Sequence, residues 1–503
     1  MLQSCILLLF SASIAFGYVT FDGKEVPTLP DPATTVIVAN VSQLYMAIRN
    51  QQAGQTILIS PGIYDVTAFE PLRISVNNLS IRGSAEDPSD VVLTGKGFEY
   101  LGDEEMFQLY ASATTFANLT LSECRGNCVK LQSMGNNNCL LHNVRFYNIG
   151  ERMIKAPNPG NIYSRAWEIR YCHFENTKIP AVNRPDDIAG GNYIAGMDLM
   201  YCDSFQIHDN VFMNIKGATG DGRGAVFTWN NSTNMDTYRN TFIGNDKAIC
   251  YWATVTEGTI KNNMIVAGAN LGARIDNSIG IKLFNNTSFS ADSGNGAFTF
   301  SGSSGCEIRN NIISGGISVT GGTYPDTANN IILTRNQKTV AARWFGDLSK
   351  GDLHMQSDTC GPVDKGMVLP SVTDDWDGRA RDSLPDIGAD EFSNNPPIDL
   401  AEFANLPKND IFLCKATPNP FNPATVMRYS VPAAMAGLPV RVHVLSLDGK
   451  HIRTLRDGHA GAGSFSLVWD ARNDAGTPVS TGVYVVTVTV GETSKTAKVT
   501  YTK

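Results

Sequence analysis

The sequence predicts an all-β protein with two parts: a parallel β-helix solenoid whose first coil is covered by a helix, and a small β-sandwich after it. Between Gly196 and Asp276, four successive segments share one pattern, a short strand, a tight turn and a second strand that leads to an Asn. The 46 glycines and 17% charged residues are typical of a β-rich chain with many turns. The end of the chain instead alternates apolar and polar residues, as antiparallel strands do.

The start of the chain predicts export. Residues 1–17 carry an apolar run too short to span a bilayer, and Ala15-Phe16-Gly17 resembles a signal-peptidase site. We therefore predict a signal peptide over 1–17, an N-terminal extension over 18–35, and a secreted or cell-surface protein. No other segment approaches the length of a transmembrane span. The net charge of -8 and the lack of a basic block with interleaved aromatics argue against nucleic acid as a partner.

Residues 40–50 (NVSQLYMAIRN) predict a short amphipathic helix. Ser42 is a suitable N-cap, and Leu44, Ala47 and Ile48 share one face. Such a helix covers the apolar end of the first coil, which would otherwise be open to water. This opening resembles the start of many secreted pectate-lyase-like right-handed β-helices, which implies a right-handed solenoid over 36–393.

The repeat continues beyond the four segments. Its spacings are 25, 28, 38, 30, 23, 23 and 25 residues between equivalent positions at Leu119, Val144, Cys172, Asn210, Asn240, Asn263, Asn286 and Asn311. A period in the low twenties with a strand pattern indicates a parallel β-helix. We expect the Asn residues to form an internal ladder in which each amide bonds to the next coil; contact with a glycan is the alternative.

The longer spacings predict where a binding face lies. Three adjacent coils carry extra residues, at Glu151–Arg165, Lys178–Ile194 and Lys216–Gly224. Insertions in a solenoid collect on the binding face more often than elsewhere. We therefore expect these three loops to overhang a site.

The solenoid ends in a distinctive segment. Residues 374–392 read DDWDGRARDSLPDIGADEF, and DIGADEF resembles the terminal segment of bacterial right-handed β-helix proteins. Asp375-Trp-Asp377-Gly378 is either a calcium loop or a structural turn, and the turn is favoured because the remaining ligand spacing is absent. The NNPP run that follows predicts a linker over 394–412.

Residues 413–503 form the predicted β-sandwich. Strands such as VRVHVLSL and VYVVTVTV are separated by Gly, Asn and Asp turns. Asn419-Pro-Phe-Asn-Pro423 and the segment WDARNDAGTPVSTGVYVVTV resemble the FlgD-type Ig-like or type IX secretion C-terminal domain of bacterial surface enzymes. The resemblance implies sorting or attachment, with the secretion machinery as partner.

Aligning the coils on their Asn residues predicts which strand residues face out. The residues twelve positions earlier form an outward column of Asp198, Thr228, Tyr251 and Arg274. Asn230 and Asp276 fall in the next outward column, and Trp229 and Trp252 are predicted to point into the core. The polar track suits a polyanionic or polyhydroxylated chain.

A lyase reaction assigns roles to these residues. β-Elimination of a uronan requires neutralisation of the substrate carboxylate, proton abstraction and protonation of the leaving oxygen. Arg274 and Arg223 are candidates for carboxylate binding or base, Tyr251 for the proton relay and Lys216 for a substitute base. The remaining candidates are Thr228, Asn230 and Asp276 for substrate binding, and Asp186, Asp187 and Asp198 for a Ca2+ site.

The chain also resembles the chondroitinase B and alginate lyase group, through its N-terminal helix and Asn-rich coils. In that family a Lys follows Ser-Asn, whereas Asn231 stands at the best-matching position here and an Arg-His-Gly segment is absent. The family's base is therefore not carried over to this chain. Cleavage of an acidic extracellular polysaccharide by a lyase is the first prediction; a non-catalytic glycan-binding protein, or a hydrolase using the paired Asp186 and Asp187, are the alternatives.

Overall fold

The computed structural model divides the chain into two compact units, Tyr18–Asn394 and Asn395–Lys503. In the first, the structure describes residues 18–392 except 133–134, 158–159, 183–186, 188, 268–270 and 291–295. In the second it describes 412–502 except 414–415, 417–418, 423–424, 432–434, 436–437 and 460–462. The predicted signal peptide and most of the predicted linker lie outside the described residues. Within the described residues, no helix is long and apolar enough to cross a membrane.

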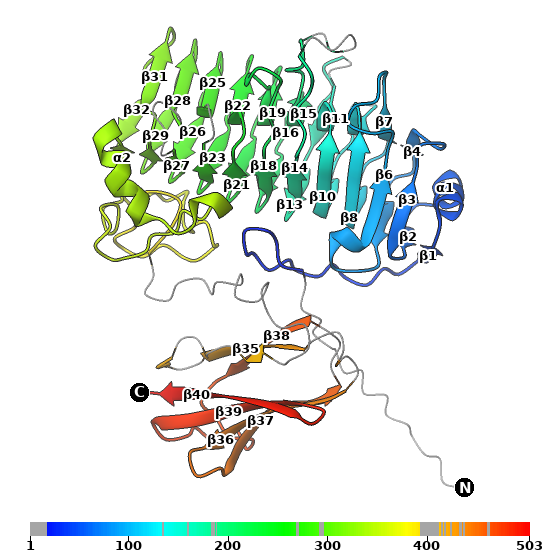
Figure 1. The fold of residues 1–503 in the computed structure, drawn as a ribbon. Coiled ribbons are helices and arrows are strands. Elements are labelled where there is room, and N and C mark those ends of the chain that lie inside the picture. The colour runs from blue at the N-terminus through cyan, green and yellow to red at the C-terminus, as the bar shows by residue number, and fades with distance from the viewer. Residues whose placement is uncertain are drawn as a thin grey trace. The chain divides into compact units, whose positions relative to one another are not determined.

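The first unit is a parallel β-helix, as the sequence predicts (Figure 1). One wall is a ten-stranded parallel sheet that contains β4 (Leu72–Ile74), β7 (Glu105–Leu109), β9 (Asn127–Leu131), β11 (Arg152–Ala156), β15 (Ala195–Met200), β19 (Gly224–Trp229), β22 (Lys247–Trp252), β25 (Leu271–Asp276), β28 (Phe298–Ser301) and β31 (Ile317–Thr320).

The other walls form a second parallel sheet of 21 strands, in which each strand pairs with its equivalent one coil away. Its strands are β1 (Thr35–Val38), β2 (Thr56–Ile59), β3 (Gly62–Asp65), β5 (Ser80–Gly83), β6 (Val91–Thr94), β8 (Thr115–Cys124), β10 (Leu140–Ile149), β13 (Glu168–Arg170), β14 (His173–Glu175), β17 (Gln206–His208), β18 (Val211–Met213), β20 (Asp236–Tyr238), β21 (Thr241–Ile243), β23 (Thr259–Lys261), β24 (Met264–Val266), β26 (Lys282–Phe284), β27 (Thr287–Phe289), β29 (Glu307–Arg309), β30 (Ile312–Ile313), β32 (Asp326–Ala328) and β33 (Ile331–Ile332). A short pair joins β12 (Ser164–Arg165) to β16 (Cys202–Asp203).

The Asn ladder is confirmed. Asn240 Nδ2 donates to Asn263 Oδ1 at 3.0 Å, and Asn263 Nδ2 donates to Asn286 Oδ1 at 2.9 Å. The same bond links Asn210 to Asn240 and Asn286 to Asn311, and all these side chains are buried. A buried amide that bonds to its neighbour on each side satisfies its own polar atoms and fixes the register of the coils.

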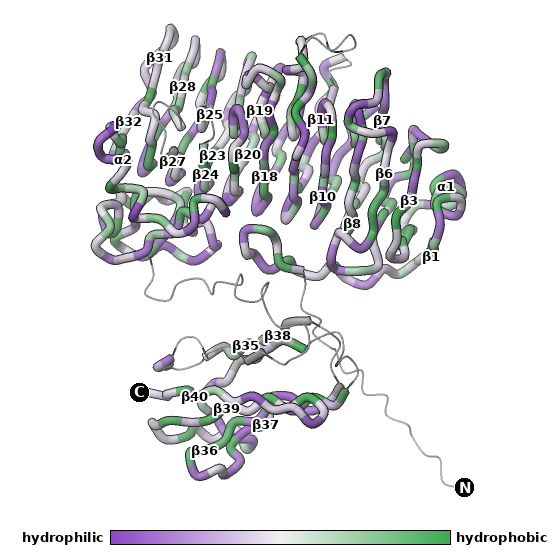
Figure 2. Tube along the Cα trace, in the orientation of Figure 1, coloured by the Kyte–Doolittle hydropathy of each residue, from purple (hydrophilic) through white to green (hydrophobic). Residues whose placement is uncertain are grey.

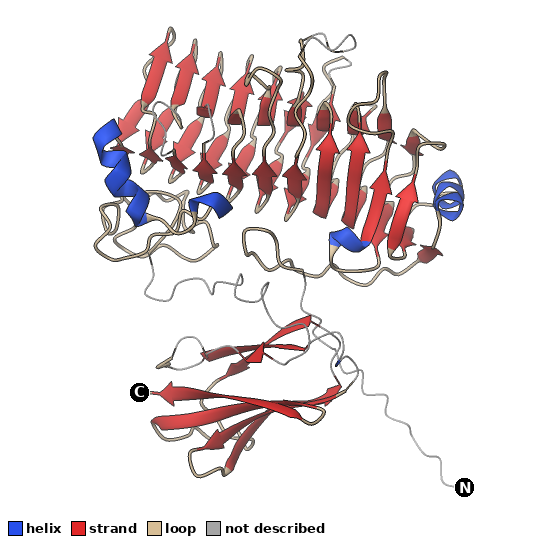
Figure 3. Cartoon of the chain, in the orientation of Figure 1, coloured by secondary structure: helices blue, strands red, loops and turns tan. Residues whose placement is uncertain are grey.

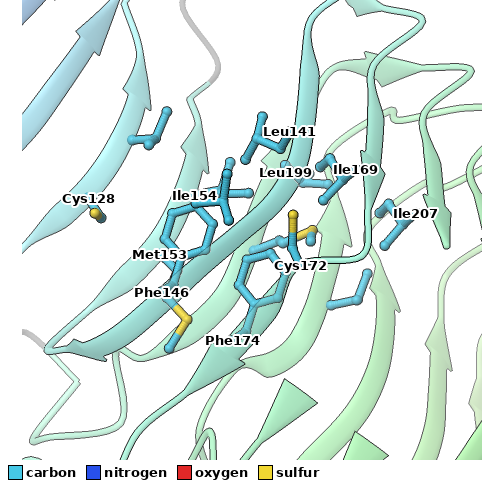
Figure 4. Packing of buried hydrophobic residues seen from close by; sticks show 14 of the residues in the cluster. Cys128, Leu141, Phe146, Met153, Ile154, Ile169, Cys172, Phe174, Leu199 and Ile207 are labelled. Atoms are coloured by element: carbon cyan, nitrogen blue, oxygen red, sulfur yellow. The ribbon is translucent and has the colours of Figure 1, made fainter. Parts of the chain in front are cut away.

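Stacked aromatic rings fill the interior beside this ladder. The rings of Phe146, Phe174, Phe212 and Phe242 follow one another with centroids 4.8, 4.6 and 4.9 Å apart. These separations match the spacing of about 4.8 Å between neighbouring strands, so equivalent residues of successive coils stack directly. Figure 4 shows Phe146 and Phe174 among the buried aliphatic residues of the core.

The predicted capping helix is present as α1 (Val41–Arg49) at the β1 end of the solenoid (Figure 1). Leu44 and Ile48 are buried against the first coil. The N-cap is Asn40 and not Ser42, because the Asn40 side chain accepts a hydrogen bond from Gln43 N at 2.9 Å.

The predicted outward columns are wrong in two coils. The strand register pairs Asp198 with Phe227 and Cys250, not with Thr228 and Tyr251. In these two coils the turn after the strand has two consecutive residues with left-handed φ, at Asn230–Asn231 and Ala253–Thr254; in the flanking coils it has one. The extra residue shifts the alignment by one position and so exchanges the two faces. Thr228 and Tyr251 therefore point inward, and Trp229 and Trp252 lie on the outer face.

Both ends of the first unit run along the outside of the 21-stranded sheet (Figure 1). In the N-terminal extension, Lys24 Nζ donates to Asp209 Oδ1 at 2.8 Å and lies 3.7 Å from the Trp376 ring centroid. In the C-terminal segment, Met367 O accepts from Asn310 Nδ2 at 2.7 Å. The helices of these regions are η1 (Pro88–Asp90), α2 (Arg335–Ala341), η2 (Ala342–Trp344) and η3 (Leu348–Lys350).

The second unit is the predicted β-sandwich (Figure 3). An antiparallel three-stranded sheet and an antiparallel four-stranded sheet enclose a core around Trp469, Tyr429 and Val442. The β39 strand is rich in hydrophobic residues (Figure 2), and buried side chains alternate with partly exposed ones along it, so one face lines that core. The strands are β34 (Phe412–Leu413), β35 (Thr425–Val431), β36 (Pro439–Ser446), β37 (His451–His459), β38 (Gly463–Trp469), β39 (Gly482–Val490) and β40 (Thr493–Tyr501).

Candidate functional site

A buried charged cluster lies on the outer face of the ten-stranded sheet, at β11 and β15. Asp198 is at its centre, with a side chain only 1% exposed. Its Oδ2 accepts from Lys155 Nζ at 2.7 Å and from Arg152 Nε at 3.2 Å, and its Oδ1 accepts from Trp229 Nε1 at 2.7 Å. The parallel register creates this cluster, because Lys155 and Asp198 are directly paired on neighbouring strands.

Burial shifts the pKa values of the two cationic side chains in this cluster. Desolvation lowers the pKa of Lys155, although the Asp198 carboxylate opposes the effect. Desolvation likewise lowers the pKa of Arg152, against the opposing charges of Asp198 and Glu151. A lowered pKa brings a lysine closer to the range in which it exchanges a proton, which is a property that a general base requires.

An aromatic platform adjoins the cluster. The rings of Trp229 and Trp252 are stacked, with centroids 5.8 Å apart and planes 11° apart, and both side chains are half-buried. Phe227, beneath them, packs 5.3 Å from the Trp229 ring. The guanidinium carbon of Arg152 lies 3.1 Å from the ring centroid of Tyr193, and that of Arg223 lies 5.5 Å from it. Flat aromatic faces beside cations can hold a charged sugar chain.

Charged pairs continue along the outer face on both sides. Towards the N-terminal end, Lys130 forms an ion pair with Glu105, which also accepts hydrogen bonds from Gln108 and Gln132. Towards the C-terminal end, Arg274 Nε donates to Asp276 Oδ2 at 2.7 Å. The track therefore offers cations and hydrogen-bonding groups over several coils.

Several predicted site residues lie on this face. Arg274 and Asp276 lie beyond Trp252, which is the register partner of Asp276. Arg223 lies in the predicted loop Lys216–Gly224, as does the half-buried Lys216. Asn230 follows β19 and its Nδ2 donates to Met200 Sδ at 3.3 Å.

Two predicted roles are wrong because the side chains face inward. Tyr251 is fully buried, and its hydroxyl forms a hydrogen bond of 2.9 Å with Thr237 Oγ1. Its hydroxyl therefore does not reach a ligand on the outer face, and burial raises the pKa of Tyr251. Thr228 is also fully buried and does not bind substrate.

Asp198, a predicted Ca2+ ligand, is engaged by other side chains. Both of its oxygens already accept hydrogen bonds, two of them from cationic side chains. Asp187 Oδ1 accepts from Ala189 N at 2.7 Å, and Asp186 lies outside the described residues.

Sequence reasoning missed Lys155 and Arg152. The signal was available, because the coil segments NCVKLQ and RMIKAP place Lys130 and Lys155 one residue after an apolar core position, as Asp198 is placed after Met197. Counting twelve positions back from Cys172 and Val144 gives Gly160 and Gln132, because these coils are longer, so the outward column did not reach either lysine.

Two family models match parts of the chain. The model for the right handed beta helix region matches residues 89–265, and the model for the FlgD Ig-like domain matches residues 429–494. The protein is therefore a right-handed parallel β-helix with a FlgD-type Ig-like domain at its C-terminal end, as the sequence predicts. No curated protein matches the sequence of this chain.

Solved structures with a similar fold are distant in sequence. An alginate lyase from Paenibacillus sp. str. FPU-7 is 14% identical, with a TM-score of 0.35 over 57% of this chain and 98% of that chain. A PL6 family polysaccharide lyase from Pseudopedobacter saltans is 14% identical, with a TM-score of 0.28 over 60% and 93%. Tailspike protein 2 of bacteriophage CBA120 is 9% identical, with a TM-score of 0.27 over 92% and 73%. At these values the likeness carries no argument about substrate or reaction.

Proposed function

We propose that this protein binds an acidic extracellular polysaccharide along the outer face of the ten-stranded sheet and cleaves it by β-elimination. The observation that carries the proposal is the juxtaposition of Lys155, held by Asp198, with the Trp229–Trp252 stack. Successive strands are spaced by about 4.8 Å, close to the length of one sugar ring, so each coil can contact one residue of the polysaccharide. The half-buried pair of stacked Trp rings then packs against the sugars beside Lys155.

The reaction assigns one task to each group. Arg152 and Arg223 neutralise the uronate carboxylate, which acidifies the proton on the adjacent carbon. In the resting site Lys155 is an ammonium paired with Asp198, and the form of Lys155 that has lost one proton to solvent is the base. It takes the substrate proton, the electron pair forms the new double bond, and the bond to the glycosidic oxygen breaks. The Lys155 ammonium then returns the proton to the leaving oxygen, so no external reagent is consumed. Asp198 orients Lys155 through the 2.7 Å hydrogen bond.

The test is incubation with alginate, pectate and chondroitin. A lyase produces ultraviolet absorbance from unsaturated uronide ends, and Lys155→Ala should lower the rate at least about 100-fold, as expected for loss of a general base. Lys282→Ala is the matched control, since Lys282 lies on β26 in the other sheet. Full activity of Lys155→Ala would refute the assignment of the base. Reducing ends without the absorbance would indicate a hydrolase, and a chelator arm tests whether calcium contributes.

A non-catalytic glycan-binding protein is the second candidate. The observation that favours it is that the Lys155 side chain is only 8% exposed and its ammonium is already paired with Asp198. Retention on an immobilised polysaccharide without any product would establish this function. If Trp252→Ala loses that retention, the polysaccharide binds to the outer face of the ten-stranded sheet even without cleavage.

Export and surface attachment belong to the same proposal. Support comes from the apolar segment in residues 1–17 and from the FlgD Ig-like domain, whose relatives in bacterial surface enzymes imply sorting by secretion machinery. N-terminal sequencing of the exported protein, recovered from the culture medium or the cell surface, should show that the chain begins at residue 18. Detection of uncleaved protein in the cytosol alone would contradict export.

A further inference from the structure

A second group of chemically capable side chains lies in the closing segment, residues 351–392, which packs along the outside of the 21-stranded sheet. His354, Asp377 and Asp390 each offer one metal-ligating atom, and these three atoms all lie within 4.8 Å of one another. Each comes from a different loop of residues 351–392. The group has no part in the proposed cleavage, since the cleavage site lies on the ten-stranded sheet.

A hydrogen bond to Asp352 fixes the orientation of the His354 ring. Its Nδ1 forms a 2.6 Å hydrogen bond with Asp352 Oδ1, and the Trp376 ring packs edge-on at 5.0 Å. This directs Nε2 towards Asp377 Oδ2, at 3.3 Å. A carboxylate that holds the far nitrogen of a histidine is the usual support of a metal-ligating imidazole.

Buried polar atoms at this place lack hydrogen-bond partners. Within the described chain, His354 Nε2, Asp377 Oδ2 and Asp375 Oδ2 are buried without a hydrogen bond, although Arg379 Nη1 approaches Asp377 Oδ2 at 3.1 Å. Asp375 is fully buried, and the charges of Asp377 and Asp390 act on it. Asp390, only 4% exposed, accepts from Met355 N through Oδ2 at 2.6 Å. Asp377 is therefore ion-paired with His354 and Arg379, whereas one oxygen of the fully buried Asp375 has no hydrogen-bond partner. A cation among these neighbouring carboxylates would offset their mutual repulsion.

We propose that His354, Asp377 and Asp390 bind a divalent transition-metal ion of the Zn2+ type. Bonds of about 2.0–2.1 Å in tetrahedral geometry place ligand atoms about 3.3 Å apart, which is the separation of His354 Nε2 and Asp377 Oδ2. One imidazole with two carboxylates favours such an ion over Ca2+, which takes oxygen ligands alone. Water completes the coordination.

The ion would hold the loops of the closing segment to one another. The same loops already contact the coils, because Ala389 N donates to Thr287 Oγ1 at 2.9 Å and Asn262 Nδ2 donates to Asp374 O at 2.9 Å. A ligand that binds only the folded state raises its stability. Metal binding should therefore raise the melting temperature of the first unit without changing its fold.

The test uses the full chain, stripped with a chelator and dialysed into metal-free buffer. Titration calorimetry with Zn2+ alone should give one site per chain, and saturating Zn2+ should raise Tm by about 3 °C or more. Asp377→Asn and His354→Gln should abolish both effects. His451→Gln is the matched control for adventitious binding, because His451 lies beside His443 in the second unit, with ring centroids 5.0 Å apart.

Three results would overturn the site. They are no Zn2+ binding by the wild-type chain, binding that survives in both variants, and binding that His451→Gln abolishes. A Tm rise with Ca2+ but not Zn2+ would overturn the assignment of the ion class. Should both variants fail to fold, Co2+ added to the wild-type chain decides. One equivalent must give the visible bands of nitrogen and oxygen coordination, and their absence refutes the proposal.

Discussion

Replacing Asp198 by Asn removes the charge that holds the candidate site together. The substitution leaves Lys155 and Arg152 buried without their shared counter-charge, since their side chains are 8% and 4% exposed. Breaking a buried ion pair in this way costs about 3–5 kcal/mol of the free energy of unfolding. For a unit of this size, an unfolding entropy of about 2 cal/mol/K per residue converts that cost to a Tm fall of about 4–6 °C.

The change in Tm is measured by thermal unfolding of four proteins: wild type, Asp198→Asn, Lys155→Met and the double variant. The double variant removes both charges, so it should recover a large part of the loss, with a coupling energy of at least about 1.5 kcal/mol. Arg165→Gln, whose side chain is 53% exposed and paired with Asp203, is the control and should lower Tm by less than about 1 °C. A Tm fall below about 1 °C in Asp198→Asn, or strict additivity in the double variant, would refute the description of a buried charged cluster.

The remaining predictions concern the platform, the ladder and pH. Trp252→Ala should weaken retention on the bound polysaccharide about 10-fold with little loss of stability, because the ring is half-buried on the outer face; unchanged retention would remove the platform from the site. Asn263→Ala should cost about 3 kcal/mol in chemical denaturation, because it breaks the bonds to Thr237 O and Asn286 and leaves buried partners unpaired; a cost near zero would contradict the ladder's contribution. Burial and the neighbouring Glu104 carboxylate raise the pKa of Glu70 from 4.5 to about 8, so the folded state keeps a proton that the unfolded state releases. The free energy of unfolding should therefore fall as pH rises from about 4.5 to 8, and Glu70→Gln should flatten this dependence; an unaltered Tm profile in Glu70→Gln would contradict it.

The sequence alone determined the repeating architecture. The spacing of Asn240, Asn263 and Asn286 gave the length of a coil, and their amides form the ladder because a residue repeated once per coil must meet its own equivalent in the next. The capping helix and the C-terminal sandwich followed from local periodicity and turn residues. All these features depend on short-range pattern, which a sequence carries directly.

Only the tertiary structure decided which side chains share the outer face. One extra left-handed residue after β19 and after β22 reversed the parity of the strands, moved Tyr251 inward and brought Trp252 out. The pairing of Lys155 with Asp198 spans a loop between two coils, and His354 meets Asp377 across a closing segment without a repeat. Because strand parity changes with a single residue, and because loop closure brings together residues with no fixed spacing, no local pattern could determine these contacts.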